Sequence, residues 1–363
     1  MVAESILGVM VIGGWDGNAY RSVEAIGFDN CSLPDLPEWR HHHGSFITSW
    51  GSLAVCGGWW SGKPASSDCL VLNTTTRQWE RGILGGLLGG LDLVSGYVRG
   101  VVTLHVGTYM VHAKTSSFLP SGEREWIAGP KPPLNVQCAT GISVDSFLAF
   151  IGTSVRQFDS RTSGPTSDQG WVPEGVWPDL LVERQRPGCA TVGELCIVAG
   201  GRNTLGETLG SVEIIFLASK SLGKANDMLK PRSHFNLVVL GKTLLAIGGN
   251  NETSIEVWEG LEEPWTLASE SLSSSKRFSS ALVVNDRVCS QGPLPPNTCP
   301  TLDGGTCVFP FRNGIEVPSI TLHYISFIQD LNSTALVLRT RTADIGVQQQ
   351  QMNEHNVTHK NAL

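Results

Sequence analysis

The segment "LLAIGG" (residues 244–249) is a short apolar run that ends in two glycines, and the chain repeats this pattern. Related segments are "LCIVAGG" (195–201), "SLAVCGG" (52–58) and "GVMVIGG" (8–14). A turn glycine precedes three of the four runs at nearly the same distance, namely Gly51, Gly193 and Gly241. Self-similarity at a regular spacing is typical of repeat architectures. The sequence therefore predicts a fold built from one repeated unit.

A second element follows the glycines, and the spacing of the glycines gives the length of the unit. It has the pattern Ser-(Val/Ile)-Glu-x-apolar, in "SVEAI" (22–26), "SVEII" (211–215) and "SIEVW" (254–258). The second glycines are Gly14, Gly58, Gly201 and Gly249, at spacings of 44, 143 and 48 residues. The longest gap has room for two more units, and weaker copies stand there as "LHVGTYMVHA" (104–113) and "SVDSFLAFIGT" (143–153). The sequence thus predicts six units.

Each unit is expected to form a four-stranded sheet. The last strand often carries a tryptophan, as at Trp79, Trp126, Trp171 and Trp265. The inner strands are continuously apolar, which is typical of sheets packed on both faces. Paired glycines allow positive φ and close backbone approach where a strand leaves a crowded centre. These structural diglycines are Gly13, Gly14, Gly57, Gly58, Gly200, Gly201, Gly248 and Gly249.

These repeats resemble kelch repeats, and residues 5–291 are similar to a six-bladed kelch β-propeller. Blades arranged radially bury both faces of every sheet. The chain begins at the second strand of a blade, and its repeats end with a lone first strand, "RFSSALVVN" (277–285). We therefore expect an all-β ring that closes by pairing residues 277–285 with residues 7–14, as kelch rings often do.

A different motif follows the repeats. The segment "GGTCVFPFRNG" (304–314) resembles the opening of a fibronectin type II module, but only Cys307 matches, and no cysteine or tryptophan follows Ile315. We predict an incomplete module start at 292–316 and a poorly structured tail at 317–363, because no disulfide framework supports a small core there. The ligand-binding residues of that family cannot be carried over.

That resemblance implies an extracellular or cell-surface protein, with a cytoplasmic one as the alternative. The N-terminal segment "MVAESILGVMVIGG" lacks the features of a signal peptide. We expect the chain to be truncated or alternatively spliced at both ends. Asparagines in N-x-Ser/Thr sequons are candidates for glycosylation at Asn73 and Asn251, and such sequons also stand at Asn30, Asn332 and Asn356.

The nine cysteines leave at least one unpaired within the chain. Cys189 and Cys196 flank a turn at Val192-Gly193, and we expect them to face each other across a hairpin. A disulfide and two buried thiols are both open for this pair.

Candidate catalytic and metal-binding residues are few. Consecutive histidines at 41–43 point to alternate faces of a strand, so we interpret them as structural or surface residues. Glu24, Glu213 and Glu256 recur at one repeat position and belong to the fold. A copper-radical enzyme resembling galactose oxidase needs paired tyrosines, but the four tyrosines are scattered, at Tyr20, Tyr97, Tyr109 and Tyr324. We expect no catalytic site, no cofactor and no metal.

The charge of the chain narrows the range of partners. A net charge of −7 argues against a nucleic-acid surface, and no apolar run reaches the length of a membrane span. We expect a monomeric scaffold that binds a protein or glycan ligand through the propeller loops. The alternative is an intracellular kelch adaptor that recognises ubiquitin-ligase substrates or associates with actin.

Overall fold

The computed structural model describes residues 7–28, 31–60, 67–87, 98–104, 107–112, 116–132, 136–162, 170–285 and 288–289. Regular structure in these residues is almost entirely strand, apart from one short 3-10 helix, η1 (Ser160–Thr162). A search of the described residues finds no helix long and apolar enough to cross a membrane. The predicted module start and tail, at 292–316 and 317–363, lie outside the described residues.

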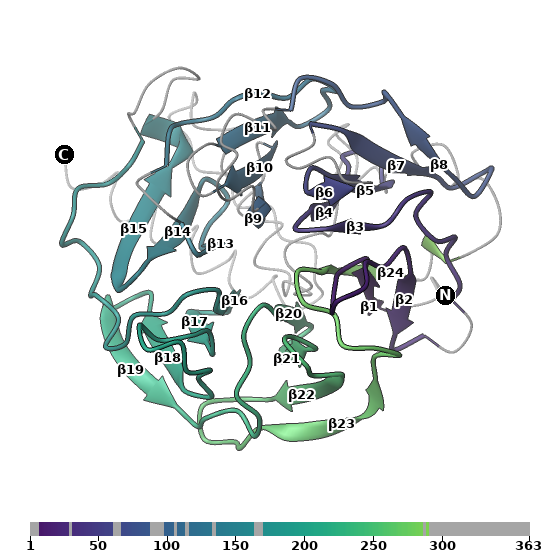
Figure 1. Cartoon of the computed structure of the whole chain (residues 1–363). Coiled ribbons are helices and arrows are strands. Elements are labelled where there is room, and N and C mark those ends of the chain that lie inside the picture. The colour runs from purple at the N-terminus through teal and green to yellow at the C-terminus, as the bar shows by residue number, and fades with distance from the viewer. Residues whose placement is uncertain are drawn as a thin grey trace, which may run out of the picture. The chain divides into compact units, whose positions relative to one another are not determined.

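The strands form six blades around a common centre (Figure 1). Blade 1 contains β24 (Ser280–Asn285), β1 (Leu7–Ile12) and β2 (Val23–Ile26). Blade 2 contains β4 (Gly44–Ile47), β5 (Leu53–Cys56), β7 (Cys69–Asn73) and β8 (Gln78–Arg81). Blade 3 contains β9 (Val98–Leu104), β10 (Gly107–His112), β11 (Ser116–Pro120) and β12 (Ile127–Ala128).

The other three blades complete the circle. Blade 4 contains β13 (Cys138–Gly141), β14 (Ser146–Ile151) and β15 (Ser154–Asp159). Blade 5 contains β16 (Gly188–Val192), β17 (Leu195–Ala199), β18 (Val212–Phe216) and β19 (Ser221–Ala225). Blade 6 contains β20 (Asn236–Leu240), β21 (Thr243–Ile247), β22 (Ser254–Trp258) and β23 (Thr266–Ser271). The short strands β3 (Arg40–His41) and β6 (Trp59–Trp60) pair beside blade 2. The predicted six-bladed propeller is confirmed.

The two ends of the propeller meet in blade 1. Strand β24 runs antiparallel to β1, with Asn285 opposite Leu7 and Ser280 opposite Ile12. The innermost strands of neighbouring blades also contact one another around the full circle, in the order β24, β4, β9, β13, β16 and β20. The predicted closure by the C-terminal strand is therefore confirmed.

The core of the described ring divides into six apolar clusters, one between each pair of neighbouring blades. Strand β17 shows how this arises, because its buried side chains alternate between two clusters. Ile197 and Ala199 pack toward blade 6, whereas Cys196 and Val198 pack toward blade 4. Each inner strand is apolar on both faces since both faces are covered.

Blades 3 and 4 form although their repeats lack a diglycine. Aromatic rings fill their shared interface, where Tyr109 lies 5.7 Å from Phe147 and 5.4 Å from Phe158 between ring centroids. In the part of blade 4 that the structure describes, the outer edge consists of a single bridge between Phe158 and Trp171. Blades 3 and 4 thus keep the apolar inner strands of the repeat. They differ from the other blades in lacking the diglycine, and blade 4 differs also in its outer edge.

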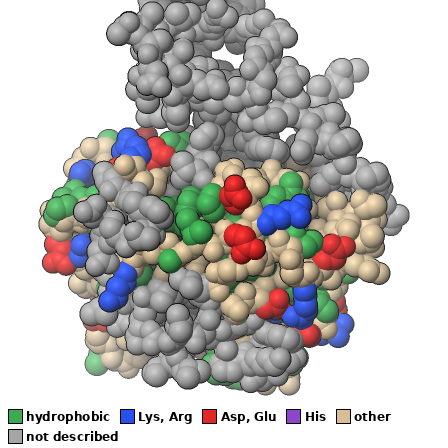
Figure 2. Space-filling model, turned by 90° about the horizontal axis from the view of Figure 1, so that it is seen from above, with side chains coloured by type: hydrophobic (Ala, Val, Ile, Leu, Met, Phe, Trp, Pro, Cys, Tyr) green, Lys and Arg blue, Asp and Glu red, His purple; other side chains and the backbone are tan. Residues whose placement is uncertain are grey.

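The outside of the ring carries both signs of charge. Figure 2 shows acidic and basic side chains interspersed on one side of the described surface. Several of these side chains form surface ion pairs, such as Arg156 with Glu174 and Lys230 with Glu252. Mixed charge of this kind suits solubility more than a single-sign binding surface.

Candidate functional site

In four blades a buried basic residue lies shortly before the innermost strand and forms an ion pair within its blade. In blade 5, Arg184 donates to Glu213 at 2.9 Å and to the carbonyl oxygen of Gly200 at 2.8 Å. Glu213 also accepts two backbone N–H groups, from Leu181 and Val182. Equivalent ion pairs join Arg232 to Glu256, Lys276 to Glu24 and Arg40 to Asp68. The repeated glutamates therefore belong to the framework, as the sequence predicted.

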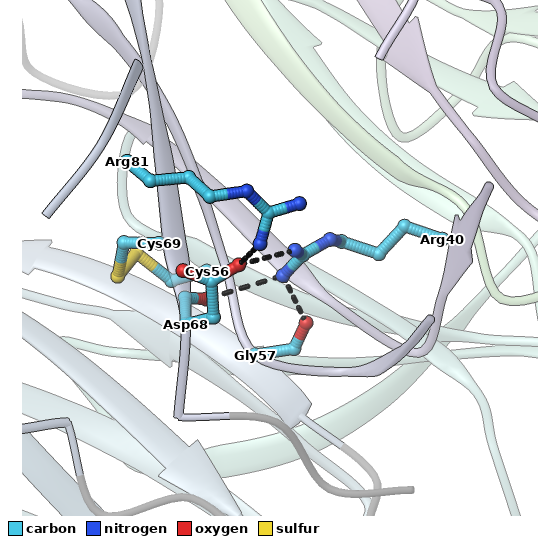
Figure 3. Close-up of a disulfide and its surroundings, with 6 residues drawn as sticks. All are labelled: Arg40, Cys56, Gly57, Asp68, Cys69 and Arg81. Atoms are coloured by element: carbon cyan, nitrogen blue, oxygen red, sulfur yellow. Dashed lines mark hydrogen bonds and ion pairs between the residues drawn. A yellow bond between two sulfur atoms is a disulfide. The ribbon is translucent and has the colours of Figure 1, made fainter. Parts of the chain in front are cut away.

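Blade 2 holds its basic residue in a different way (Figure 3). Arg40 donates to the carbonyl oxygens of Gly57 and Asp68 and to the Asp68 carboxylate, which Arg81 also contacts. Beside this group a disulfide joins Cys56 to Cys69, directly opposite each other on β5 and β7. The acid of this blade stands at the position of Ser211 in blade 5, since Gly57 donates to the carbonyl of Asp68 as Gly200 donates to that of Ser211, and Leu70 stands where blade 5 has Glu213.

Four residues, one from each of the neighbouring blades 5, 6, 1 and 2, form an arc that we call the entrance. They are His42, Arg186, His234 and Phe278, each two residues before an innermost strand. All four have positive φ, between 57° and 60°. Non-glycine residues rarely adopt this conformation, and in folded proteins such outliers gather at functional sites.

Backbone hydrogen bonds connect the entrance from blade to blade. The amide of His42 donates to the carbonyl of Phe278 at 2.8 Å, and that of Phe278 donates to the carbonyl of His234 at 3.3 Å. The amide of His234 in turn donates to the carbonyl of Arg186 at 3.2 Å. These bonds link four neighbouring blades, from blade 5 through blades 6 and 1 to blade 2.

Phe278 lies at the centre of the entrance side chains. His42 stacks on its ring at 3.6 Å between centroids, and His234 meets it edge-on at 4.4 Å. The Arg186 guanidinium lies 5.0 Å from the same ring and contacts His234. Cationic and aromatic groups from four blades therefore meet at Phe278.

A second set of residues surrounds the entrance, each directly after a diglycine. These residues are Trp15, Trp59, Arg202 and Asn250. Arg202 exchanges two backbone hydrogen bonds with Gln185, and Trp15 exchanges two with Arg277. The diglycines place them here, because all eight glycines have positive φ and a Cβ at Gly13 or Gly200 would meet a backbone oxygen at 2.3 or 2.4 Å.

Arginine charges act on their neighbours around the entrance, and Asp16 offsets this effect on Arg277 in part. Burial lowers the pKa of Arg277, and the positive charge of Arg202 lowers it further. Burial, with a contribution from Arg277, lowers the pKa of His41 to about 4, so that histidine is neutral at physiological pH. Arg277 keeps its charge because an arginine pKa starts far above neutrality. The region can therefore attract an anion.

Two adjoining cavities open along the axis of the ring. A cavity of about 240 Å³ lies at the entrance and is lined by residues such as Arg186, His234, Asn236 and Ser279. A larger cavity of about 540 Å³ continues among the innermost strands of all six blades. Ala139, Cys189 and Ala281 line both cavities. A small ligand group could thus enter the ring at this end.

The predicted cysteine pair requires a correction. Cys189 lies opposite Val198, and Cys196 lies opposite Thr191, so the two cysteines do not face each other. The expected register is wrong because Gly193, with φ of +56°, takes the first turn position and Val192 stays in the strand. Cys189 and Cys196 are thiols, and burial raises the pKa of both.

The structure adds a disulfide that the sequence did not indicate. Cys31 and Cys289 are joined although 258 residues separate them, and the cross-link fastens the start of the ring to its end. Together with the Cys56–Cys69 bond it accounts for four cysteines among the described residues. Cys299 and Cys307 lie outside the described residues.

The other candidate residues lie apart from one another. His43 is buried beside Gly58 and lines the entrance cavity together with His42, whereas the His41 ring stacks with Trp59 at 5.9 Å between ring centroids. Tyr20 donates to Asp16, and Tyr109 is buried between blades 3 and 4, while Tyr97 and Tyr324 fall outside the described residues. Within the described residues, no group of three or more His, Cys, Asp or Glu is placed to hold a metal ion.

The two candidate glycosylation sites differ in exposure. Asn251 is exposed in the turn between β21 and β22. Asn73 is half-buried, and its amide donates to Glu80 at 2.7 Å while its oxygen accepts backbone amides from Thr75 and Thr76. Asn251 is thus the more accessible acceptor. Asn30, Asn332 and Asn356 lie outside the described residues.

The entrance could have been found by aligning the repeats upstream of the inner strands. The aligned segments are "RHHHG" (40–44), "RQRPG" (184–188), "RSHFN" (232–236) and "KRFSS" (276–280). Their first position is always basic, and this residue is the buried framework cation. Their third position varies, and this residue forms the entrance. The constant first position thus marks the framework, whereas the second to fourth positions all vary, and the positive φ of the third distinguishes the entrance.

Comparisons with known proteins add no relative. No protein-family model matches the chain, and no curated protein matches it.

Proposed function

We propose that this chain is a non-catalytic, kelch-type propeller that binds a protein or glycan ligand at the entrance. The observation that carries the proposal is the contrast between constant and varied repeat positions. The framework pairs are alike in blades 5 and 6, even to the carbonyl oxygens that the arginines contact. The strained entrance residues vary more, with histidine in blades 2 and 6, arginine in blade 5 and phenylalanine in blade 1, as expected for a surface that selects one ligand.

We further propose that the propeller belongs to a secreted or cell-surface protein. Disulfides persist in oxidising compartments and are rare in the cytosol. The Cys31–Cys289 and Cys56–Cys69 bonds both link residues that lie opposite or close in the fold, with Cα atoms 5.0 and 4.1 Å apart. The type II-like segment after the propeller supports the same compartment.

The test is affinity capture with three immobilised forms of the full chain. These are the wild type, Phe278→Asn at the entrance, and Lys242→Gln in the turn at the opposite end of β20. Asparagine tolerates positive φ, so Phe278→Asn removes the ring with little change in the backbone. Each form is exposed to an extracellular fraction and to a cytosolic extract, and bound molecules are identified by mass spectrometry.

The proposal expects an extracellular molecule that the wild type and Lys242→Gln retain and that Phe278→Asn loses. A ligand retained equally by all three forms would place binding elsewhere on the ring. A ligand found only in the cytosolic extract would overturn the proposed compartment. Melting temperatures of the three forms confirm that each is folded.

A further inference from the structure

Three thiols lie together at the interface between blades 4 and 5. Cys138 is the first residue of β13, and Cys189 and Cys196 lie on β16 and β17. All three belong to the apolar cluster that fills this interface, and none of them takes part in a disulfide. The described ring thus holds a group of thiols in addition to its two disulfides.

Cys138 and Cys189 enter this interface from opposite sides. On β13, Ala139 packs toward blade 3, and alternate residues of a strand point to opposite faces, so Cys138 points toward blade 5. On β16, Ala190 packs toward blade 6, so Cys189 points toward blade 4. The two side chains therefore face each other between the innermost strands of the two blades.

Two hydrogen bonds show how β13 and β16 are aligned. The hydroxyls of Thr140 and Thr191 share a hydrogen bond, with their Oγ1 atoms 3.1 Å apart. Nearer the entrance, the amide of Arg186 donates to Oε1 of Gln137 at 3.1 Å. Gln137 and Arg186 line the entrance cavity, and the two threonines line the larger cavity. Both strands therefore run in the same direction, away from the entrance.

Cys138 and Cys189 lie between these two hydrogen bonds. Each comes two residues before its threonine and is on the same face of its strand. A threonine Oγ1 and a cysteine Sγ are both attached directly to Cβ. The alignment that brings the two hydroxyls to 3.1 Å therefore places the two thiols opposite each other, one step nearer the entrance. The pKa of Cys189 agrees with this, because after burial the Cys138 thiol raises it most.

The two cavities give access to this pair. Cys138 and Cys189 line the entrance cavity, and Cys189 also lines the larger one. Cys189 is the most exposed of the three thiols, whereas Cys196 is fully buried opposite Thr191 on the next strand outward. A small reagent that enters the ring at the entrance therefore reaches Cys189 first.

From this geometry we infer that Cys138 and Cys189 are a redox pair, which forms a disulfide between β13 and β16 by exchange with a small disulfide such as oxidised glutathione. The Cys189 thiolate attacks one sulfur of the reagent and releases one molecule of reduced thiol. The Cys138 thiolate then attacks Sγ of Cys189 and releases the second molecule. Two protein thiols are oxidised, and one reagent disulfide is reduced to two thiols, which take up the two protons.

Burial makes this exchange slow at neutral pH. It raises the pKa of the Cys189 thiol, and only the thiolate attacks a disulfide. The exchange therefore accelerates as the pH rises. This inference goes beyond the proposed function, because it holds whichever ligand the entrance binds.

The test is oxidation of the full chain in a series of glutathione buffers at about pH 8, with a rising share of oxidised glutathione. Samples are quenched with acid, denatured and alkylated, and mass spectrometry identifies the state of every cysteine. The protein is used as wild type, Cys138→Ser, Cys189→Ser and the control Cys196→Ser, which removes a thiol of the same cluster outside the pair. Wild type unfolded in guanidinium shows that the reagent is active.

We expect Cys138 and Cys189 to lose their alkylation together and to appear as one linked pair of peptides, while Cys196 stays a thiol. Cys138→Ser should stop at a mixed disulfide between glutathione and Cys189, because the second thiol is absent. In Cys189→Ser, Cys138 should react at least about tenfold more slowly than Cys189 does in Cys138→Ser, because it is less exposed. Cys196→Ser should form the same linked peptides as the wild type.

Three results in the wild type would overturn the inference. The first is that Cys138 and Cys189 stay thiols while the unfolded chain reacts. The second is a separate mixed disulfide on each of them, and the third is a link from either one to a different cysteine. Melting temperatures under reducing conditions show whether each variant is folded. The wild-type result decides the matter even where a variant is not.

Discussion

Arg232 and Glu256 form an ion pair in which neither side chain is exposed, with Nη2 of the arginine 2.8 Å from Oε1 of the glutamate. The same arginine donates to the carbonyl oxygens of Gly248 and Ser254 at 2.8 Å. The pair thus connects the approach to the inner strand, the diglycine and the third strand of blade 6. Every hydrogen-bonding group of the arginine has a partner, which is the condition under which a buried charge is tolerated.

Removing one member of this pair should be costly. We expect Arg232→Met to lower the free energy of unfolding by about 3–5 kcal/mol, because Glu256 is left buried and unpaired. The double variant Arg232→Met/Glu256→Gln should recover part of that loss. Urea denaturation measures both. As a control, Glu174→Gln breaks the pair with Arg156 in which Glu174 is 78% exposed, at a cost below about 1 kcal/mol. Equal costs for Arg232→Met and Glu174→Gln would contradict the framework role.

The disulfide between Cys31 and Cys289 should contribute more stability than the one between Cys56 and Cys69. The first spans 258 residues and the second spans 13, and a longer closed loop removes more entropy from the unfolded chain. Losses of about 2–5 kcal/mol are typical for such bonds. We compare Cys31→Ser/Cys289→Ser with Cys56→Ser/Cys69→Ser by thermal denaturation. A larger loss in the second double variant would show that closure of the ring does not depend on the long-range bond.

Acid should destabilise the propeller through His43. Burial, together with the nearby Arg40 and His41, lowers the pKa of His43 well below the ordinary value of 6.5. A backbone hydrogen bond with Ile12 raises this pKa, but its effect is smaller. The unfolded chain therefore binds more protons than the folded one below about pH 6.5, and stability falls as the pH falls further. The lowered pKa of His41, about 4, acts in the same direction.

The variant His43→Leu tests this prediction, because leucine does not titrate. Its melting temperature should fall less than that of the wild type between pH 7 and pH 5, whatever its value at pH 7. The comparison uses the slope and is therefore independent of any packing cost. Parallel slopes for the two proteins would show that His43 does not carry the pH dependence.

Asn251 should carry a glycan when the chain passes through a secretory pathway. Its side chain is exposed, whereas that of Asn73 is held by Glu80. Intact mass before and after enzymatic deglycosylation measures occupancy, and Thr253→Ala removes the sequon while leaving Asn251 with its φ of +58° unchanged. An unmodified Asn251 in secreted protein would contradict the predicted accessibility.

The repeats made the propeller predictable because the diglycines and apolar strands reflect local requirements. A glycine pair such as Gly200-Gly201 indicates backbone with positive φ. An apolar run such as Ile197 to Ala199 indicates a strand that is buried on both faces. The hairpin register at Gly193 was not predictable in the same way. Shifting a two-residue turn by one position keeps the same alternation of apolar residues, so the pattern does not choose between the two registers.

The candidate site depends on contacts that the sequence does not record. Arg277 lies 4.0 Å from the ring of Trp15 only because β24 closes the circle beside β1. The long-range disulfide arises from the same closure. The positive φ of Arg186 had no signal either, since arginine rarely adopts this conformation. Comparison of repeats at these positions would have indicated variation, although not its geometry.

The central claim is that a ligand binds at the entrance, and site-specific photocrosslinking tests it most directly. A photoreactive amino acid replaces Leu205, which is 81% exposed and lies three residues after Arg202. A second form carries it at Lys242, at the other end of β20. Irradiation in an extracellular fraction should give a specific crosslinked product from position 205 that Phe278→Asn abolishes. Crosslinking only from position 242, or a product from position 205 that survives Phe278→Asn, would contradict the account.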